Sequence, residues 1–202
     1  MNFLGHFFLS PTDNDALLLG NFLGDFIKGN IKQSLLPIDV RRGIALHREI
    51  DSFTDFHKLI LIAKKLFSTQ YRRYSGIIID MSLDHFLARD WHLYRTQTLT
   101  VFSQYVYKTL NNHLDNMPAS AQSAATSMHR YDWLMSYHKL ENLVFAFENI
   151  GKRFSHNNPM STATEEIQRL YEPLQTLFHK FILEINNHVA SRQVQTMLAD
   201  IQ

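Results

Sequence analysis

The sequence predicts an all-α fold in a single domain spanning residues 1–202, and three observations support this. Glycine and proline are scarce, with seven and five in 202 residues. Apolar residues recur at intervals of three and four through most of the chain, which is the spacing of one helix face. No segment alternates apolar and polar residues clearly enough to indicate a strand. A chain of this length can bury a substantial core as one unit.

Capping residues, prolines and glycines divide the chain into the expected helices. Ser10–Asp13 should start the first helix, and Gly29 should end it. Residues 71–76 should form a break, and Pro173 should kink or divide the last helix. The expected helices are 14–28, a segment after Pro37 that is continuous over 44–62, 77 to about 92, 97–115, 120–128, 130–149 and 162–190.

The composition is that of a folded globular protein with an aromatic core. Hydrophobic residues make up 45% of the chain and aromatic residues 12%, including 15 Phe and 8 Tyr. The formal net charge of +1 gives no whole-chain indication of nucleic-acid binding. The absence of cysteine excludes disulfides, thiolate metal ligands and cysteine nucleophiles. Any metal must therefore use oxygen and imidazole ligands, which suits Mn²⁺, Mg²⁺ or Fe better than a structural zinc.

The first ten residues, MNFLGHFFLS, are apolar but lack the basic segment and the small-residue cleavage site of a secretory signal. The longest apolar runs are too short to span a bilayer. We therefore expect a cytoplasmic protein without a membrane partner.

Ionisable residues in the first 90 positions occupy three short helical segments at spacings that suit a metal: Asp25, His47, Asp51, Asp80, Asp84 and His85. In two segments a ligand-type residue is followed by another four positions on, so both side chains project from one helix face. Helical wheels place the carboxylates on apolar arcs, where their neighbours include Ile44, Ile50, Leu61 and Ile62. Because a buried unpaired carboxylate is costly, a cation shared between the pairs is a natural solution.

The same residues also allow a structural interpretation. A single His/Asp pair four residues apart is more often a surface ion pair or a capping contact than a metal site. His6 stands alone in an apolar segment, where a histidine is usually a satisfied core residue. Arg130 and Tyr137 are phosphate-binding residue types on one expected helix face, but a structural role is commoner for such residues.

Five segments carry a family resemblance: MNFLGHFFLS, GNFLGDFIKG, GIALHREIDSFTDFH, GIIIDMSLDHFLARDW and RYDWLMSY. In this order they resemble the bacterial acyl carrier protein phosphodiesterases over most of the chain, with Gly5 where that family usually has Ala. The resemblance implies an all-helical, HD-domain-like bundle and an activity that depends on Mn²⁺. It also implies hydrolysis of the phosphodiester that joins 4′-phosphopantetheine to a serine of holo-acyl carrier protein. The usual HD signature is His-Asp, whereas the adjacent pair here is Asp84-His85.

With this resemblance, the expected activity is a metal-dependent phosphodiesterase that produces apo-acyl carrier protein. A cation held by the Asp and His residues would polarise the phosphoryl oxygen and activate a water. Lys28 and Arg48 are expected to contact the phosphate, and Asp55 to carry a proton or orient a metal ligand. Basic residues around these segments should attract the small, acidic, helical carrier protein; they include Arg41, Arg42, Lys64, Lys65, Arg72 and Arg73.

Two alternatives stay open on the sequence. The first is an HD-like metal phosphohydrolase that acts on a nucleotide such as a guanosine polyphosphate, because the same metal site would serve. The second is a non-enzymatic helical binding module in which the Asp/His pairs are structural ion pairs. Hydrolysis of a small molecule without any carrier protein would favour the first, and a folded protein that holds no metal would favour the second.

Overall fold

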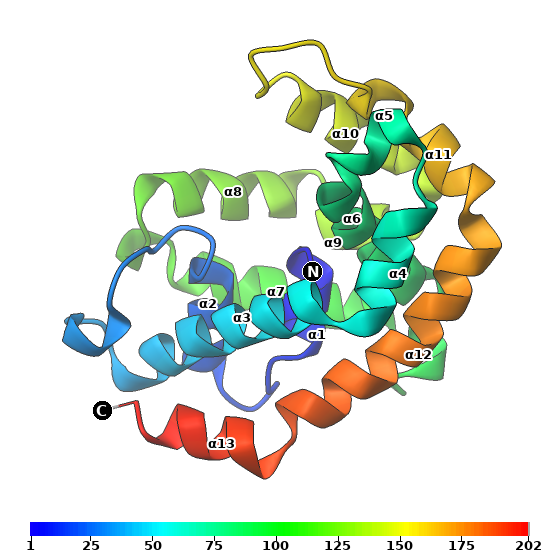
Figure 1. The fold of residues 1–202 in the computed structure, drawn as a ribbon. Coiled ribbons are helices and arrows are strands. Elements are labelled where there is room, and N and C mark those ends of the chain that lie inside the picture. Colours follow the sequence, from blue (N-terminus) through cyan, green and yellow to red (C-terminus); the bar gives the residue numbers. More distant parts are fainter. Residues whose placement is uncertain (202) are drawn as a thin grey trace.

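The computed structural model describes residues 1–201, apart from the side chain of Arg192. Within this part of the chain the regular structure consists of α-helices and short 3-10 turns, without a strand (Figure 1). The all-α prediction is therefore confirmed. Among the same residues, no helix combines the length and the apolar character needed to cross a membrane.

The α-helices are α1 Phe3–Phe8, α2 Asp15–Leu23, α3 Ile38–Phe56, α4 Lys58–Leu66, α5 Thr69–Arg72, α6 Ser75–Arg89, α7 Leu99–Asn112, α8 Ala119–Arg130, α9 Trp133–Ser136, α10 Leu143–Gly151, α11 Ala163–Arg169, α12 Tyr171–Val189 and α13 Arg192–Ala199. The 3-10 turns are η1 Ile31–Gln33, η2 Trp91–Leu93, η3 Leu114–Asn116, η4 Leu140–Asn142 and η5 Met160–Thr162. The core is strongly aromatic, as the composition indicated, with fully buried rings at Phe7, Phe22, Phe67, Phe86, Phe102, Phe147, Phe178 and Phe181.

Several expected helix boundaries were wrong. The expected helix 14–28 ends at Leu23, and the expected helix 130–149 is interrupted. Asp132 causes the second difference, because its φ of 47° is left-handed and ends α8. The last long helix is divided at Leu170 instead of at Pro173. Pro173 lies in the first turn of α12, where a missing backbone N–H leaves no helical hydrogen bond unmade.

The treatment of residues 44–62 as one helix was also wrong. His57 is extended, with ψ 132°, and its Nδ1 accepts a hydrogen bond from Leu59 N at 3.3 Å, so it caps a new helix. Ile44 is buried, as the wheel predicted, but Leu61 and Ile62 lie on α4 and are exposed. The change of helix direction after Phe56 turns these two side chains toward solvent.

The helices that carry the site are held together by close backbone contacts. α2 and α3 cross at Gly20 and Gly43, where any Cβ would overlap the carbonyl oxygens of Val40 and Leu17. α1 packs against both α2 and α6. In Figure 1 the N-terminus lies near the middle of the molecule, beside α1 and α3. This arrangement brings residues from the first 90 positions to one centre.

Candidate metal centre

Asp51 binds two histidines that come from different helices. Its Oδ1 lies 3.1 Å from Nε2 of His6 on α1, and its Oδ2 lies 3.1 Å from Nε2 of His47 on α3. The two imidazole rings are stacked, with centroids 4.0 Å apart and planes 14° apart. The ligand-type atoms of the three residues all lie within 4.8 Å of one another. This is the spacing that donor groups around a single cation require.

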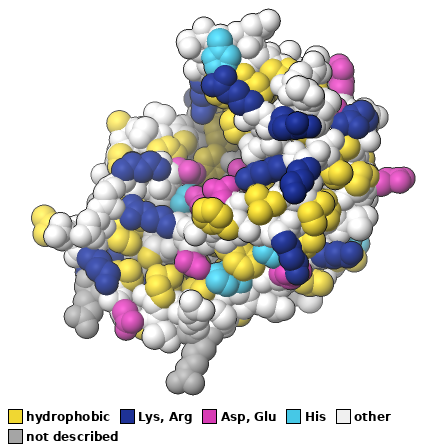
Figure 2. All heavy atoms as spheres, in the orientation of Figure 1, with side chains coloured by type: hydrophobic (Ala, Val, Ile, Leu, Met, Phe, Trp, Pro, Cys, Tyr) yellow, Lys and Arg dark blue, Asp and Glu magenta, His cyan; other side chains and the backbone are white. Residues whose placement is uncertain are grey.

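Two further carboxylates border this group. Oδ1 of Asp25 lies 3.6 Å from Nε2 of His47. Oδ1 of Asp80 lies 3.2 Å from the amino group of Met1, which is also 3.8 Å from Asp51. Figure 2 shows acidic side chains gathered near the middle of this face, with a histidine beside them and basic side chains around them. The centre is open, since the side chains of Asp25 and Asp51 are 49% and 43% exposed.

The electrostatics of the two carboxylates differ. Burial raises the pKa of Asp51, but the hydrogen bond from His47 and the positive charge of the Met1 amino group act against burial, and the pKa stays below its ordinary value. Burial also raises the pKa of Asp80, and there it prevails over the attraction of the Met1 amino group. The negative charges of Asp51 and Asp55 raise the pKa of Asp80 further. A cation would therefore relieve an accumulation of negative charge at Asp80.

His6 is held in one orientation by a buried polar network. Asn21 Nδ2 donates to the carbonyl oxygen of His6 at 2.9 Å and to Ser10 Oγ at 2.8 Å. Asn21 Oδ1 must then accept from Nδ1 of His6, which is 3.0 Å away. The ring proton of neutral His6 is consequently on Nδ1, and the lone pair on Nε2 faces Asp51.

This geometry fits a bound cation. Burial lowers the pKa of His6 to about 4, so the ring is neutral near pH 7. A neutral Nε2 lone pair then faces a carboxylate oxygen of Asp51 at 3.1 Å, and two acceptors do not attract each other. A cation between them would satisfy both. The imidazole and carboxylate donors suit a divalent transition metal better than a soft metal, which prefers sulfur ligands.

Asp84 contributes to the centre through α1. It is fully buried, and its oxygens accept from the backbone N–H groups of Leu4 at 2.7 Å and Gly5 at 3.0 Å. Burial raises its pKa to about 7, although these two hydrogen bonds act in the opposite direction. Both carboxylate oxygens are therefore engaged in holding the start of the helix that carries His6.

His85 is directed away from the group around Asp51. Its Nδ1 donates to the carbonyl oxygen of Tyr137 at 2.8 Å, and its Nε2 lies 2.8 Å from the hydroxyl of Tyr171. Arg89 donates to the same hydroxyl, and His85, Arg89 and Tyr171 line a cavity of about 690 Å³. Burial lowers the pKa of His85. The structure thus does not bring this predicted ligand together with His6, His47 and Asp51.

The residues expected to serve catalysis flank the centre. Arg48 donates to the carbonyl oxygens of Ile27 at 3.1 Å and Gly29 at 2.9 Å, which fixes the loop after α2. Lys28 lies in this loop and is exposed, and its Nζ is 3.5 Å from the carbonyl oxygen of Gly24. Asp55 lies one turn after Asp51 and pairs with Lys64 at 3.4 Å.

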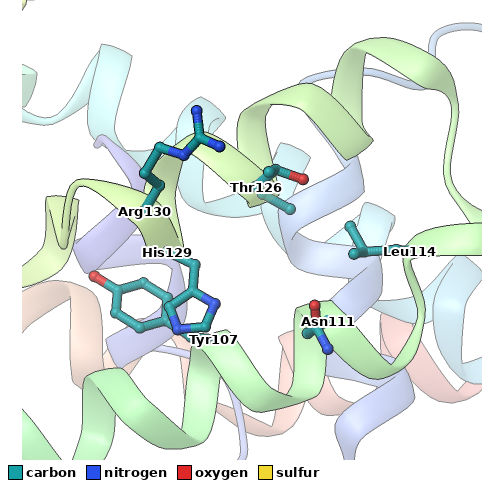
Figure 3. Close-up of a pocket in the computed structure, with 7 residues that line it drawn as sticks. Tyr107, Asn111, Leu114, Thr126, His129 and Arg130 are labelled. Atoms are coloured by element: carbon teal, nitrogen blue, oxygen red, sulfur yellow. The ribbon is translucent and has the colours of Figure 1, made fainter.

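Arg130 belongs to a separate pocket of about 510 Å³ between α7 and α8 (Figure 3). The ring of His129 stacks on Tyr107 along one wall, with centroids 5.2 Å apart. Tyr137 lies elsewhere, buried, and its hydroxyl accepts from Asn2 at 2.8 Å. Arg130 and Tyr137 therefore do not form the shared phosphate contact that their spacing allowed.

The sequence interpretation missed His6 and its partner Asn21 as members of the centre. Both lie on helix faces that are otherwise apolar, and that placement was the available signal. It did not identify them because α1 and α2 meet only in the folded chain, and a lone buried polar residue is usually structural.

The fold and the centre define an all-α protein with a His/Asp group of the metal-ligand type. The family model for acyl carrier protein phosphodiesterase matches residues 1–185, and the chain belongs to this family. A relative of that name from Photorhabdus laumondii is 34% identical over 182 residues, which are 90% of this chain and 91% of the relative. One from Yersinia pestis is 34% identical over 195 residues, covering 96% of this chain and all of the relative. No solved structure matches the chain, so the HD-domain-like bundle stays a prediction.

Proposed function

We propose that this protein hydrolyses the phosphodiester between 4′-phosphopantetheine and a serine of holo-acyl carrier protein, releasing apo-carrier. Two findings support the proposal together. The chain belongs to the acyl carrier protein phosphodiesterase family, and its first three helices assemble an open His/Asp centre around Asp51. The centre is the single observation that carries the chemistry, because a phosphodiester needs an electrophile and an activated water for rapid hydrolysis.

The proposed cofactor is a divalent cation, with Mn²⁺ favoured over Mg²⁺ or Fe. His6, His47 and Asp51 would hold it, and Asp25 and Asp80 are the proposed additional oxygen ligands. When bound, such an ion supplies Lewis-acid polarisation of the phosphoryl group and activation of a water. The imidazole ligands suit Mn²⁺ or Fe more than Mg²⁺, which prefers oxygen donors and keeps several waters.

The surrounding side chains have proposed roles of their own. Lys28 is proposed to contact a phosphate oxygen, because its loop adjoins Asp25 and its amino group lies 3.5 Å from the carbonyl oxygen of Gly24, a long contact that a phosphate could replace. Arg48 would act through the loop, whose carbonyl oxygens it holds. Asp55 would carry the proton lost by the attacking water to the departing serine oxygen, because it is exposed one helical turn beyond Asp51. His85 and Asp84 would position helices around the centre instead of binding the metal.

The test is the mass of holo-acyl carrier protein after incubation with the protein and Mn²⁺. We expect loss of the 4′-phosphopantetheine mass, no loss after treatment with a chelator, and recovery when Mn²⁺ is restored. Guanosine polyphosphates, analysed by chromatography at equal enzyme and metal, should stay largely intact. Rapid nucleotide hydrolysis with an unchanged carrier mass would contradict the carrier reaction. An unchanged mass together with no bound metal would favour a non-enzymatic binding module.

A further inference from the structure

The outer face of α4 is unusual because large apolar side chains and lysines alternate on it. Phe56, just before this helix, is 80% exposed, and Leu61 and Ile62 on the helix are 44% and 47% exposed. Lys58 and Lys65 lie at either end of the same stripe, since 58, 61, 62 and 65 follow the spacing of one helix face. We call these five residues the α4 surface.

The opposite face of α4 explains why this stripe stays outside. Leu59, Ile60 and Ala63 are buried, where α4 packs against α6 and α12. The helix therefore has a complete inner face, and none of the exposed apolar residues is needed to anchor it. Single exposed apolar residues are common on protein surfaces, but three large ones within seven positions form a patch that water solvates poorly.

The α4 surface lies next to the metal centre. Lys64, on the flank of α4, is 3.4 Å from Asp55, which follows Asp51 by one helical turn. α6, against which α4 packs, carries Asp80. In Figure 2 apolar and basic side chains lie on the same face of the molecule as the central acidic group. A macromolecule seated on α4 would thus have its reacting group within reach of the centre.

The basic residues on and near the α4 surface indicate an acidic partner. Lys65 has no ion pair within residues 1–201, and the exposed side chains of Arg72 at the end of α5 and of Arg73 directly after it extend the positive potential. Lys58 is partly neutralised, because its Nζ is 3.9 Å from Glu184. An acidic helical surface with a few apolar side chains matches this face in both charge and polarity.

We propose that the α4 surface is the docking site of the carrier protein, with Leu61 and Ile62 covered by apolar side chains of an acidic helix. This inference rests on the proposed function and goes beyond it by assigning the contact surface. The lysines would steer the acidic partner during approach, and the apolar contacts would slow its release. Lysine stems would also cover part of the apolar contact while their amino groups stay in water.

The experiment compares variants of the α4 surface with matched variants of α7, which packs on α2 and α8 instead. Leu61→Ser combined with Ile62→Ser removes the apolar contact, and Lys65→Glu reverses the charge. Val101→Ser and Lys108→Glu are the controls, because both residues are exposed on α7. Each protein is assayed for hydrolysis of holo-carrier, for binding of apo-carrier by calorimetry, and for thermal unfolding.

We expect each α4 variant to raise the KM for holo-carrier and weaken apo-carrier binding by about tenfold or more, as for contacts central to an interface. The change in kcat should be small by comparison, and the α7 controls should match the original protein. Unchanged KM and unchanged apo-carrier binding in both α4 variants would overturn the docking site while leaving the proposed reaction intact. If the original protein does not alter the carrier mass, the proposed function itself fails, and the docking site fails with it.

Discussion

Nδ1 of His6 donates to Oδ1 of Asn21 at 3.0 Å, and this bond determines which ring nitrogen faces Asp51. The amide cannot rotate to the opposite orientation without losing its two donor contacts, to the His6 carbonyl and to Ser10. Histidine ligands of metals are commonly oriented by such a partner on the other ring nitrogen, which fixes the tautomer. Asn21 is completely buried, so its role in the centre is positional.

Asn21→Ala should weaken binding of Mn²⁺ by about 10–100-fold, the usual effect of removing a partner that orients a metal ligand. The physical reason is that His6 would lose the acceptor that holds its proton on Nδ1. The measurement is calorimetric titration of metal-free protein, with circular dichroism to verify the fold. Asn142→Ala serves as the control, because this side chain is exposed and bonds the Ser136 carbonyl. An unchanged affinity in a folded Asn21→Ala protein would show that His6 needs no such support.

Asp51→Asn and Asp80→Asn should both abolish hydrolysis, but they should change the stability of the metal-free protein in opposite directions. The pKa of Asp51 is held below its ordinary value, so its charge stabilises the folded state and its loss should lower the unfolding temperature. The pKa of Asp80 is raised, chiefly by burial, so removing that charge should raise the unfolding temperature. Mn²⁺ affinity should fall at least about 100-fold for Asp51→Asn, more than the effect of an outer partner. Normal turnover in either variant would show that its carboxylate is not a ligand of the catalytic metal.

Gly24→Ala tests the packing of the loop after α2 on the metal centre. Gly24 has ordinary helical angles, φ −55° and ψ −33°, so alanine itself causes no backbone strain. Its Cβ would, however, overlap the imidazole ring of His47. We expect a loss of about 1–3 kcal/mol in unfolding free energy, typical of overpacking, together with weaker Mn²⁺ binding.

Gly76→Ala is the matched control for this substitution. Its Cβ would meet only Lys64 Cε, at 4.0 Å, and its place in α6 favours alanine. Denaturant titrations should therefore show equal or greater stability for Gly76→Ala. Equal stability and metal affinity in the two variants would mean that the His47 ring adjusts without loss.

The sequence was informative about the centre where both members of a pair lie on one helix. His47 and Asp51 share a face of α3, so their contact follows from helix geometry alone. Asp25 and Asp80 were also identified, and the structure brings them to the edge of the same group. Their meeting depends on helix packing, for which the apolar arcs were the only local signal.

The remaining members depend on contacts that no local pattern encodes. His85 directly follows Asp84 in the sequence, but it faces a different part of the structure, between Tyr137 and Tyr171. Conversely, His6 enters the centre because Asp84 fixes the start of α1 from 79 or 80 residues away. The break at His57 illustrates the same point, because one capping side chain turned Leu61 and Ile62 from expected core positions to the surface.

The stability of the metal-free protein should carry a pH dependence that originates at Asp84. Its pKa rises from 3.8 in the unfolded chain to about 7 in the folded protein, with burial as the main cause. Between these values the folded state holds a proton that the unfolded chain has released, so stability falls as pH rises through this window and levels off above about pH 7. The contribution is on the order of 4 kcal/mol across the window. His6 acts in the opposite direction below its ordinary pKa, because its pKa is lowered to about 4 and the unfolded chain binds the additional proton.

Asp84→Asn isolates this effect. The variant has no acid to titrate at this position, so its unfolding free energy relative to the original protein should increase with pH from 5 to 7. The expected slope approaches about 1.4 kcal/mol per pH unit, the value for one proton. Urea unfolding in the presence of a chelator measures the difference at each pH, and exposed Asp115→Asn provides the control that should show no such slope. Because asparagine offers only one acceptor to the N–H groups of Leu4 and Gly5, the variant should be less stable than the original at pH 5. A constant difference between the two proteins from pH 5 to 7 would mean that Asp84 is ionised throughout this range and acts as a permanently charged cap of α1.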